Sequence, residues 1–271
     1  MTRRPAQTQT VIEVRNLVTG FGPQIVHDGL DLDVWKGEIL GVVGGSGTGK
    51  SVLMRTILGL NPKRAGTITV FGQSRENLDR AEKRTLDRRM GVLFQDGALF
   101  SALTVAENIQ VPLREHFDMP QPLMDDIAAL KIALVGLPPD AGGKYPSELS
   151  GGMRKRAGLA RALALDPEIV FLDEPTAGLD PIGAARFDHL ILNLRDALGF
   201  TVFMVTHDLD SLHAICDRIA VLAEHKVIVE GDMDAMLSYD HPWVRDYFKG
   251  PRSRAAGHTP QQVPAHTQEG A

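Results

Sequence analysis

The chain has a single cysteine, Cys216, among its 271 residues. One cysteine excludes an intrachain disulfide framework, a pattern typical of proteins in a reducing compartment. No stretch approaches eighteen consecutive apolar residues, so the sequence predicts no membrane-spanning helix. The basic N-terminus is not followed by an apolar core, so we expect no signal peptide. Any role at a membrane is therefore expected to go through a partner protein.

Neither sign of charge dominates the sequence. Its 29 Lys and Arg and 34 Asp and Glu residues give a formal net charge of −5. This balance argues against non-specific binding to the phosphates of DNA or RNA, and we expect no nucleic-acid partner. Because 43% of the residues are hydrophobic, the chain can bury a full core in one or two domains.

A glycine-rich stretch from Gly44 to Ser51 lies between an apolar run over residues 39–43 and a second over 52–54. It fits the phosphate-binding pattern G-x-x-x-x-G-K-[ST], in the strand-before, helix-after context that phosphate binding requires. The glycines let backbone N–H groups turn inward, and the helix N-terminus adds a partial positive charge. We expect Lys50 to reach the terminal phosphates and the Ser51 hydroxyl to bind Mg²⁺. The sequence therefore predicts a nucleotide-binding protein.

The predicted secondary structure changes along the sequence. Residues 1–10 are expected to be a disordered arm, and residues 11–70 are rich in short strand patterns. A capping box over 104–107 opens a predicted helix, and residues 96–160 as a whole are predicted to form a helical insertion. Four apolar residues in this insertion recur at helical spacing: Ile127, Leu130, Leu134 and Leu137.

Strand and helix patterns alternate after the insertion. Residues 168–172 and 201–205 are apolar on both faces, as expected of central parallel strands, and residues 185–198 are predicted to form a helix between them. Together with the phosphate loop, this alternation predicts a doubly wound parallel sheet with the ligand at the carboxyl ends of its strands.

Two carboxylates end the first of these strands. Asp173 is placed to hold Mg²⁺ through water, opposite Ser51. Glu174 projects one residue further and is the natural general base for an attacking water. The run by itself is equally compatible with an ordinary acidic turn before Pro175.

A second candidate anion site lies over Leu149–Met153, where Ser150 precedes two glycines at the start of a predicted helix. Two such sites, far apart in one chain, indicate a composite site with one face from each of two subunits. A simple N-capped helix is the alternative, because a serine followed by two glycines is common there.

The chain resembles the ATP-binding subunits of ABC transporters over roughly Val11 to Ser238. The family's motifs occur in order: Walker A at Gly44–Ser51, the Q-loop at Gln95, the signature at Leu149–Met153, Walker B at Ile169–Glu174, the D-loop at Ala177–Asp180 and the switch histidine at His207. The resemblance implies an α/β fold: a P-loop NTPase core with a mostly parallel sheet, an N-terminal antiparallel β subdomain and an inserted α-helical subdomain.

The resemblance also implies the roles of individual residues. Gln95 is expected to touch Mg²⁺ and to sense the membrane partner, whereas His207 is expected to contact the γ-phosphate and orient the water. Mg²⁺ is expected at Ser51, Gln95 and Asp173. The expected ATP-binding residues are Phe21 (stacked on adenine), Gly44, Gly45, Ser46, Gly47, Thr48, Gly49, Lys50, Ser51, Gln95, Ser150, Gly151, Gly152 and Asp180.

One departure from the family pattern narrows the resemblance. The signature ends in Met153 where the family has Gln, and Arg154–Arg156 follow it. With the segment 94–100, this variant is similar to the Mla/Mce phospholipid-transport group. That group implies a head-to-tail homodimer that powers phospholipid transport linked to outer-membrane lipid asymmetry. The implied partners are permease subunits of MlaE type and accessory subunits of the small cytoplasmic STAS type (MlaB type) and the Mce-domain type (MlaD type). The implied location is the cytoplasmic face of the inner membrane.

Other functions compete with phospholipid transport. The same cassette serves amino-acid importers, although segment 94–100 and Met153 weigh against that cargo. A DNA-repair clamp needs long coiled coils between its Walker motifs, and the 123 positions from Lys50 to Asp173 leave no room. Paired translation-type cassettes need two Walker A motifs, whereas this chain has one. An Fe–S assembly ATPase stays open, and pull-down of a hydrophobic permease would discriminate it.

One apolar segment and one aromatic-rich segment have two interpretations each. Residues 98–100 form either core of the helical insertion or part of a groove that receives a permease helix. Residues 239–250 contain four aromatics and are predicted to be a docking segment, either on their own domain or on a partner. Residues 251–271 are predicted to be a disordered tail.

Overall fold

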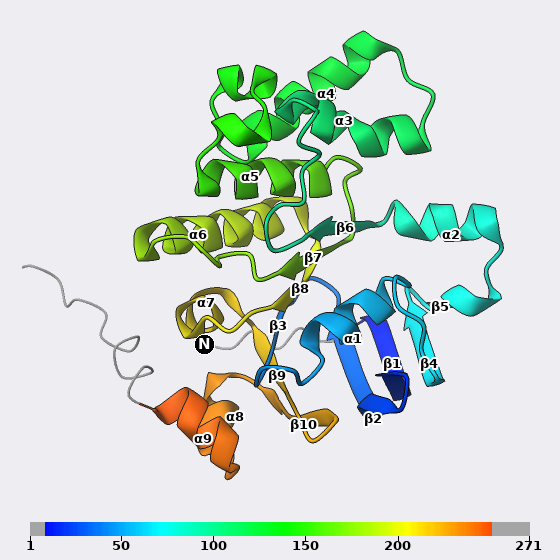
Figure 1. Cartoon of the computed structure of the whole chain (residues 1–271), viewed down its shortest axis with the longest axis vertical. Helices are drawn as coiled ribbons and strands as arrows, with labels where there is room; N and C mark the ends of the chain where they lie inside the picture. The colour runs from blue at the N-terminus through cyan, green and yellow to red at the C-terminus, as the bar shows by residue number, and fades with distance from the viewer. Residues whose placement is uncertain (1–8, 251–271) are drawn as a thin grey trace, which may run out of the picture.

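The structure, a computed structural model, describes residues 9–250, so the predictions for residues 1–8 and 251–271 lie outside it. Its centre is a six-stranded sheet in the order β10-β9-β3-β8-β7-β6 (Figure 1), in which β10 is antiparallel to β9 and the other neighbours are parallel. Every residue of β3, β7 and β8 is buried, as their continuous apolar runs predict. The strands are β3 (Ile39–Gly44), β6 (Met90–Leu93), β7 (Ile169–Asp173), β8 (Thr201–Val205), β9 (Arg218–Ala223) and β10 (Lys226–Gly231).

A second, antiparallel sheet of four strands has the order β2-β1-β4-β5. Its strands are β1 (Thr10–Phe21), β2 (Gln24–Trp35), β4 (Ala65–Val70) and β5 (Gln73–Ser74). One apolar core joins both sheets, with Ile12 and Leu30 from the antiparallel sheet and Phe171 and Phe203 from the parallel one. β1 begins at Thr10, so the predicted boundary of a disordered arm at residue 10 is wrong by at least this residue.

The helices divide into a group at the upper end of Figure 1 and others beside the parallel sheet. Their bounds are α1 (Lys50–Ile57), α2 (Arg80–Asp87), α3 (Val105–His116), α4 (Gln121–Leu134), α5 (Gly151–Ala162), α6 (Pro181–Leu198), α7 (Leu209–Ile215), α8 (Met233–Ser238) and α9 (Pro242–Lys249). The capping box predicted at Thr104 and Glu107 is confirmed. α6 begins four residues before the predicted start at 185, because Asp180 caps it.

The buried face of α4 only partly follows the apolar spacing in the sequence. Leu130 is 62% exposed, whereas Met124, Ala128 and Ile132 face the core of the helical group. These three residues form an i, i+4, i+8 row next to the leucine stripe, and Ala128 permits close packing there. The periodicity therefore predicted the helix correctly, but one of its four apolar residues, Leu130, lies on the exposed side. The division of the chain into domains stays a prediction.

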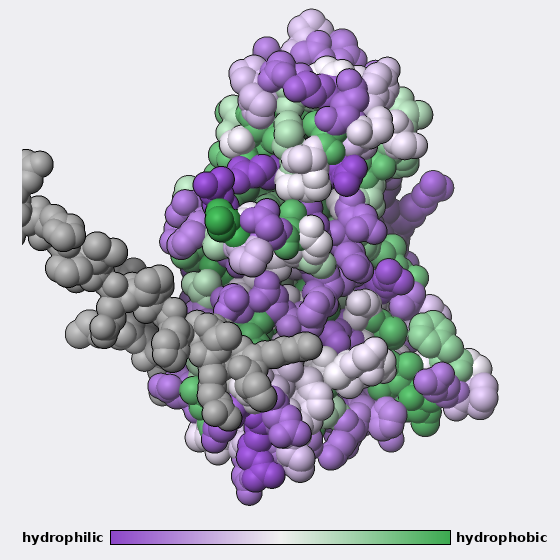
Figure 2. Space-filling view, turned by 60° about the vertical axis from the view of Figure 1, so that its left-hand side comes forward, coloured by the Kyte–Doolittle hydropathy of each residue, from purple (hydrophilic) through white to green (hydrophobic). Residues whose placement is uncertain are grey.

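The aromatic segment forms helix α9, which packs on its own domain. Val244 and Phe248 are buried in one apolar cluster with Val43, Leu212 and Val221. The described residues thus favour docking on the same chain. None of the helices between residues 9 and 250 is long and apolar enough to cross a membrane. On the face shown in Figure 2, hydrophilic side chains predominate and hydrophobic ones form small separate groups.

Candidate active site

The glycine-rich loop connects the end of β3 to the start of α1. Gly49 has φ +96°, a conformation that side chains disfavour, and a Cβ atom there would lie 2.5 Å from His27 Nε2. A Cβ on Gly44 would lie 2.4 Å from the carbonyl oxygen of Leu222. Only glycine fits these positions, so the backbone can turn its N–H groups toward an anion at the N-terminus of α1.

Lys50 is folded against this loop. Its Nζ donates to the carbonyl oxygens of Gly44 at 2.8 Å and Gly45 at 3.0 Å. Burial lowers the pKa of Lys50, and the carboxylates of Glu174 and Asp173 oppose that shift. The ammonium group therefore lies at the loop with neutral carbonyls as its hydrogen-bond partners, which a phosphate can replace.

Ser51 and Asp173 meet where α1 begins and β7 ends. Ser51 Oγ donates to Asp173 Oδ1 at 3.2 Å. Burial raises the pKa of Asp173, whereas the hydrogen bond from Ser51 and the nearby Arg55 lower it. A hydroxyl and one carboxylate suit Mg²⁺, which keeps several waters and takes its remaining ligands from substrate phosphates. The described residues contain no cluster of three His, Cys, Asp or Glu side chains that could hold a metal by themselves.

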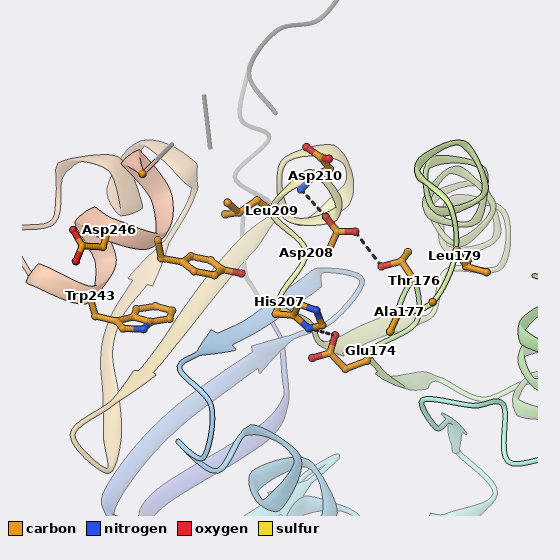
Figure 3. A pocket seen from close by; sticks show the side chains of 13 residues that line it. Glu174, Thr176, Ala177, Leu179, His207, Asp208, Leu209, Asp210, Trp243 and Asp246 are labelled. Carbon is orange, nitrogen blue, oxygen red and sulfur yellow. Dashed lines mark hydrogen bonds and ion pairs between the residues drawn. The ribbon is translucent and has the colours of Figure 1, made fainter. Parts of the chain in front are cut away.

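Glu174 and His207 come together from neighbouring strands. β7 and β8 run in parallel, so the residues that follow them share one edge of the sheet, and His207 Nδ1 lies 2.7 Å from Glu174 Oε2 (Figure 3). Glu174 has φ +51°, a strained conformation for a residue with a side chain. Its backbone N–H donates to the carbonyl of Val205 at 2.8 Å, which holds it in place. Strain of this kind clusters at functional sites.

Other predicted site residues lie apart from this group. Phe21 and Gln95 have exposed side chains at the ends of β1 and β6. Ser150 is exposed and caps α5, accepting from Met153 N at 3.3 Å, and Asp180 caps α6. α5 belongs to the upper group of helices in Figure 1 and α1 to the lower part of the molecule. In the described part of the chain, no hydrogen bond or ion pair joins the signature to the phosphate loop, so its ligand role stays a prediction.

Lys155 also belongs to the site, although the sequence did not predict it there. It is buried on α5, and its Nζ donates to the carbonyl oxygens of Gln95 at 2.5 Å and Glu174 at 2.9 Å. Burial lowers its pKa, and the charges of Asp96 and Glu174 oppose that shift. One feature of the sequence could have indicated its burial: this lysine lies within one helical turn of the small apolar residues that follow it on α5.

Helix α9 forms the other wall of the cleft next to Glu174 and His207 (Figure 3). The indole nitrogen of Trp243 lies 3.4 Å from where a Cβ on Gly45 would stand. Trp243 stacks on Tyr247 with ring centroids 4.7 Å apart. The Tyr247 hydroxyl is buried without a hydrogen-bond partner among the described residues, and burial raises its pKa. Helix α9 thus abuts the phosphate loop, which the sequence did not indicate.

Comparison with known proteins agrees with this geometry. The "ABC transporter" family model matches residues 27–177. The chain is 40% identical to the intermembrane phospholipid transport system ATP-binding protein MlaF of Haemophilus influenzae, over 89% of this chain and 91% of that protein. It is 39% identical to the probable ribonucleotide transport ATP-binding protein mkl of Mycobacterium leprae, over 89% of this chain and 69% of that protein.

A solved structure shares most of this fold. It is a dimeric ATP-binding cassette in a post-hydrolysis state with ADP and phosphate bound, and it matches with a TM-score of 0.74 at 28% identity, over 82% of this chain and 98% of that one. The phosphate loop, the Ser51–Asp173 pair and Glu174 all lie within residues 27–177, which the family model matches. The chain therefore belongs to the ABC transporter family, as an ATP-binding subunit that hydrolyses ATP with Mg²⁺.

Proposed function

We propose that the chain powers a transporter that moves phospholipid between membranes. The observation that carries this proposal is the 40% identity to MlaF, a phospholipid transport protein, over 91% of its length. Met153, where the family usually has Gln, also supports it. The match to mkl, a probable ribonucleotide transport protein, supports a second cargo, but this chain spans only 69% of it.

The site supports a division of labour in hydrolysis. Glu174 takes a proton from the attacking water, and His207, 2.7 Å away, orients that water toward the γ-phosphate. Lys50 binds the terminal phosphates once it leaves the loop carbonyls. Ser51, Asp173 and Gln95 would hold Mg²⁺, which when bound would neutralise charge that develops on the phosphates.

The signature supports a composite site between two copies. Ser150 and Gly151 are exposed at the N-terminus of α5, apart from the phosphate loop of their own chain. A helix N-terminus binds anions, so in a head-to-tail homodimer Ser150, Gly151 and Gly152 would complete the ATP site of the other copy. The dimeric state of the related cassette supports this arrangement.

The remaining assignments concern partners and location. Permease subunits of MlaE type would dock where Phe100 is 54% exposed, on the groove beside Gln95. Accessory subunits of MlaB and MlaD type would complete the complex on the cytoplasmic face of the inner membrane. Within the chain, residues 11–238 form the ATPase domain, residues 96–160 its helical subdomain, and residues 239–250 the docking segment.

Glu174→Gln tests the proposed chemistry. The amide cannot accept the proton of water, so hydrolysis should fall by about a hundred- to ten-thousandfold while ATP binding persists. Phosphate release and ATP titration measure the two effects, and Glu13→Gln, an exposed substitution in β1, is the matched control. Near-normal hydrolysis by Glu174→Gln would remove Glu174 from the role of base.

Co-purification tests the cargo. The chain, isolated with its permease from membranes, is analysed by lipid mass spectrometry and then reconstituted between labelled donor and acceptor vesicles. Phospholipid transfer that needs ATP and stops in Glu174→Gln is the expected result. ATP-dependent uptake of ribonucleotides without lipid transfer would favour the second cargo, and recovery with no permease would contradict a transporter.

A further inference from the structure

A chain of hydrogen-bonding side chains runs from α6 to the loop that carries His207. Asp188 of α6 accepts from Ser211 of α7, with 2.8 Å between Ser211 Oγ and Asp188 Oδ2. Ser211 Oγ lies 3.4 Å from Thr176 Oγ1, and Thr176 donates to Asp208 Oδ2 at 3.3 Å (Figure 3). These hydrogen bonds therefore join α6 and α7 to both loops that border the catalytic cleft.

Asp188 and Ser211 are buried where α6 packs against α7. Asp188 is 3% exposed and Ser211 is fully buried. Oδ1 of Asp188 has no hydrogen-bond partner among the described residues. Burying a carboxyl group that is only half satisfied is unfavourable, and two apolar side chains would hold α6 against α7 at least as well. An incompletely satisfied buried acid is therefore better explained by a role in the site.

The surroundings of Asp188 allow both of its protonation states. Burial raises the pKa of Asp188 to about 6, although the hydrogen bond from Ser211 lowers it. The other titratable and charged groups that face it are Asp208 and Asp210, which raise the pKa, His189, which lowers it, and the buried thiol of Cys216.

The proton on Asp188 decides the direction of the hydrogen-bond chain. Ser211 and Thr176 have one hydroxyl hydrogen each. When Asp188 is ionised, Ser211 donates to it, and the single hydrogen of Thr176 faces two acceptors, Ser211 and Asp208. When Asp188 is protonated, it can donate to Ser211, whose hydrogen then turns to Thr176. Thr176 is then left with Asp208 as its only acceptor.

We propose that Asp188 is a positioning residue for ATP hydrolysis: through Ser211 and Thr176 it sets how firmly the loop containing His207 and Asp208 is held. Asp208 follows His207 directly and begins α7 by accepting from Asp210 N at 2.9 Å. A change in the hydrogen bond between Thr176 and Asp208 therefore affects both His207 and the first turn of α7. This inference rests on the proposed roles of Glu174 and His207.

Two substitutions of Asp188 separate positioning from a structural role. In the full-length chain, Asp188→Asn and Asp188→Leu should lower kcat by about two- to tenfold, the worth of one hydrogen bond, with KM for ATP changed less than about twofold. Asp188→Leu should unfold in urea at the same or a higher concentration, because it removes a buried acid. A structural role predicts the reverse: lower stability with unchanged kcat. Asp196→Asn, an exposed acid on the same helix, is the control.

The pH profile supplies a readout that packing does not move. Wild-type kcat should contain a titration near pH 6 that Asp188→Asn lacks. Ser211→Ala breaks the same row of hydrogen bonds without replacing Asp188. Its effect on kcat and that of Asp188→Asn should therefore be less than additive. Superimposable pH profiles, or additive effects, overturn the inference. Glu174→Gln is measured in parallel: if it abolishes hydrolysis while the Asp188 variants match wild type, only the inference fails, whereas an active Glu174→Gln contradicts the proposed function itself.

Discussion

Substitution of Phe248 measures how firmly helix α9 is attached to the ATPase core. Phe248 is 2% exposed and packs with Val43 and Leu212, next to the phosphate loop. Phe248→Ala removes a buried aromatic ring and leaves a cavity, which should lower the free energy of unfolding by about 3–5 kcal/mol. For a chain of this size, about 2–4 °C per kcal/mol translates this into a melting temperature lower by about 6–20 °C.

Trp243 should have a smaller effect on stability, because it is only partly buried. Trp243→Ala loses the stack with Tyr247, worth about 0.5–1.5 kcal/mol beyond the buried area. Urea unfolding followed by circular dichroism gives both free energies, and ATP-driven dimerisation is measured separately by light scattering. Tyr239→Ala is the matched control: it lies in the same aromatic segment but is exposed, and should change stability by about 0.5 kcal/mol or less.

The opposite result would refute self-docking. If Phe248→Ala with Trp243→Ala left the unfolding free energy unchanged but weakened dimerisation, these rings would be anchors on a second copy or another subunit. Reduced stability with normal dimerisation of the folded fraction is the result that the buried position of Phe248 requires.

Two further predictions concern the composite site and acid sensitivity. Ser150→Arg and Lys50→Ala should each fail in ATP-driven dimerisation, but their mixture leaves one intact composite site and should recover part of it; a mixture no better than either parent contradicts the head-to-tail arrangement. Burial lowers the pKa of His27 to about 4, so below about pH 6.5 the unfolded chain binds a proton that the folded chain does not. Stability should therefore be unaffected above pH 6.5 and fall by up to about 3 kcal/mol as the pH drops toward 4. Urea midpoints at several pH values test this, and His27→Leu should flatten the slope; an equal slope would assign the acid sensitivity to other groups.

The phosphate-binding half of the site could be predicted because its residues are neighbours in the sequence. Gly44 to Ser51 carry a local pattern that fixes a loop between a strand and a helix, and the run before Asp173 identifies the strand that ends beside it. Parallel strands place their carboxyl ends together, so the meeting of Ser51 and Asp173 follows from the order of elements alone.

The rest of the site depends on contacts between distant segments. Lys155 reaches Gln95 and Glu174, which lie 60 and 19 positions away. Trp243 lies beside Gly45, which is 198 positions away in the sequence (243 − 45). Neither residue belongs to a local pattern, because which face a helix turns inward is decided by the surfaces it meets. Leu130 shows the same limit: it shares the helical spacing of the neighbouring apolar residues, yet it lies on the exposed side of α4.

The backbone of Glu174 is held from two directions, and this constrains how ATP hydrolysis can respond to a membrane partner. β8 fixes the backbone N–H of Glu174 through Val205, and α5 fixes its carbonyl through Lys155. Because the same Lys155 ammonium also holds the carbonyl of Gln95, a shift of α5 against β7 must lengthen one of its two bonds. The strained φ of +51° at Glu174 persists only while such neighbours impose it. Any movement of the helical group that carries Ser150 is therefore expected to reach Glu174, the proposed general base, through the hydrogen bonds that Lys155 donates to backbone carbonyls, before a nucleotide contact changes.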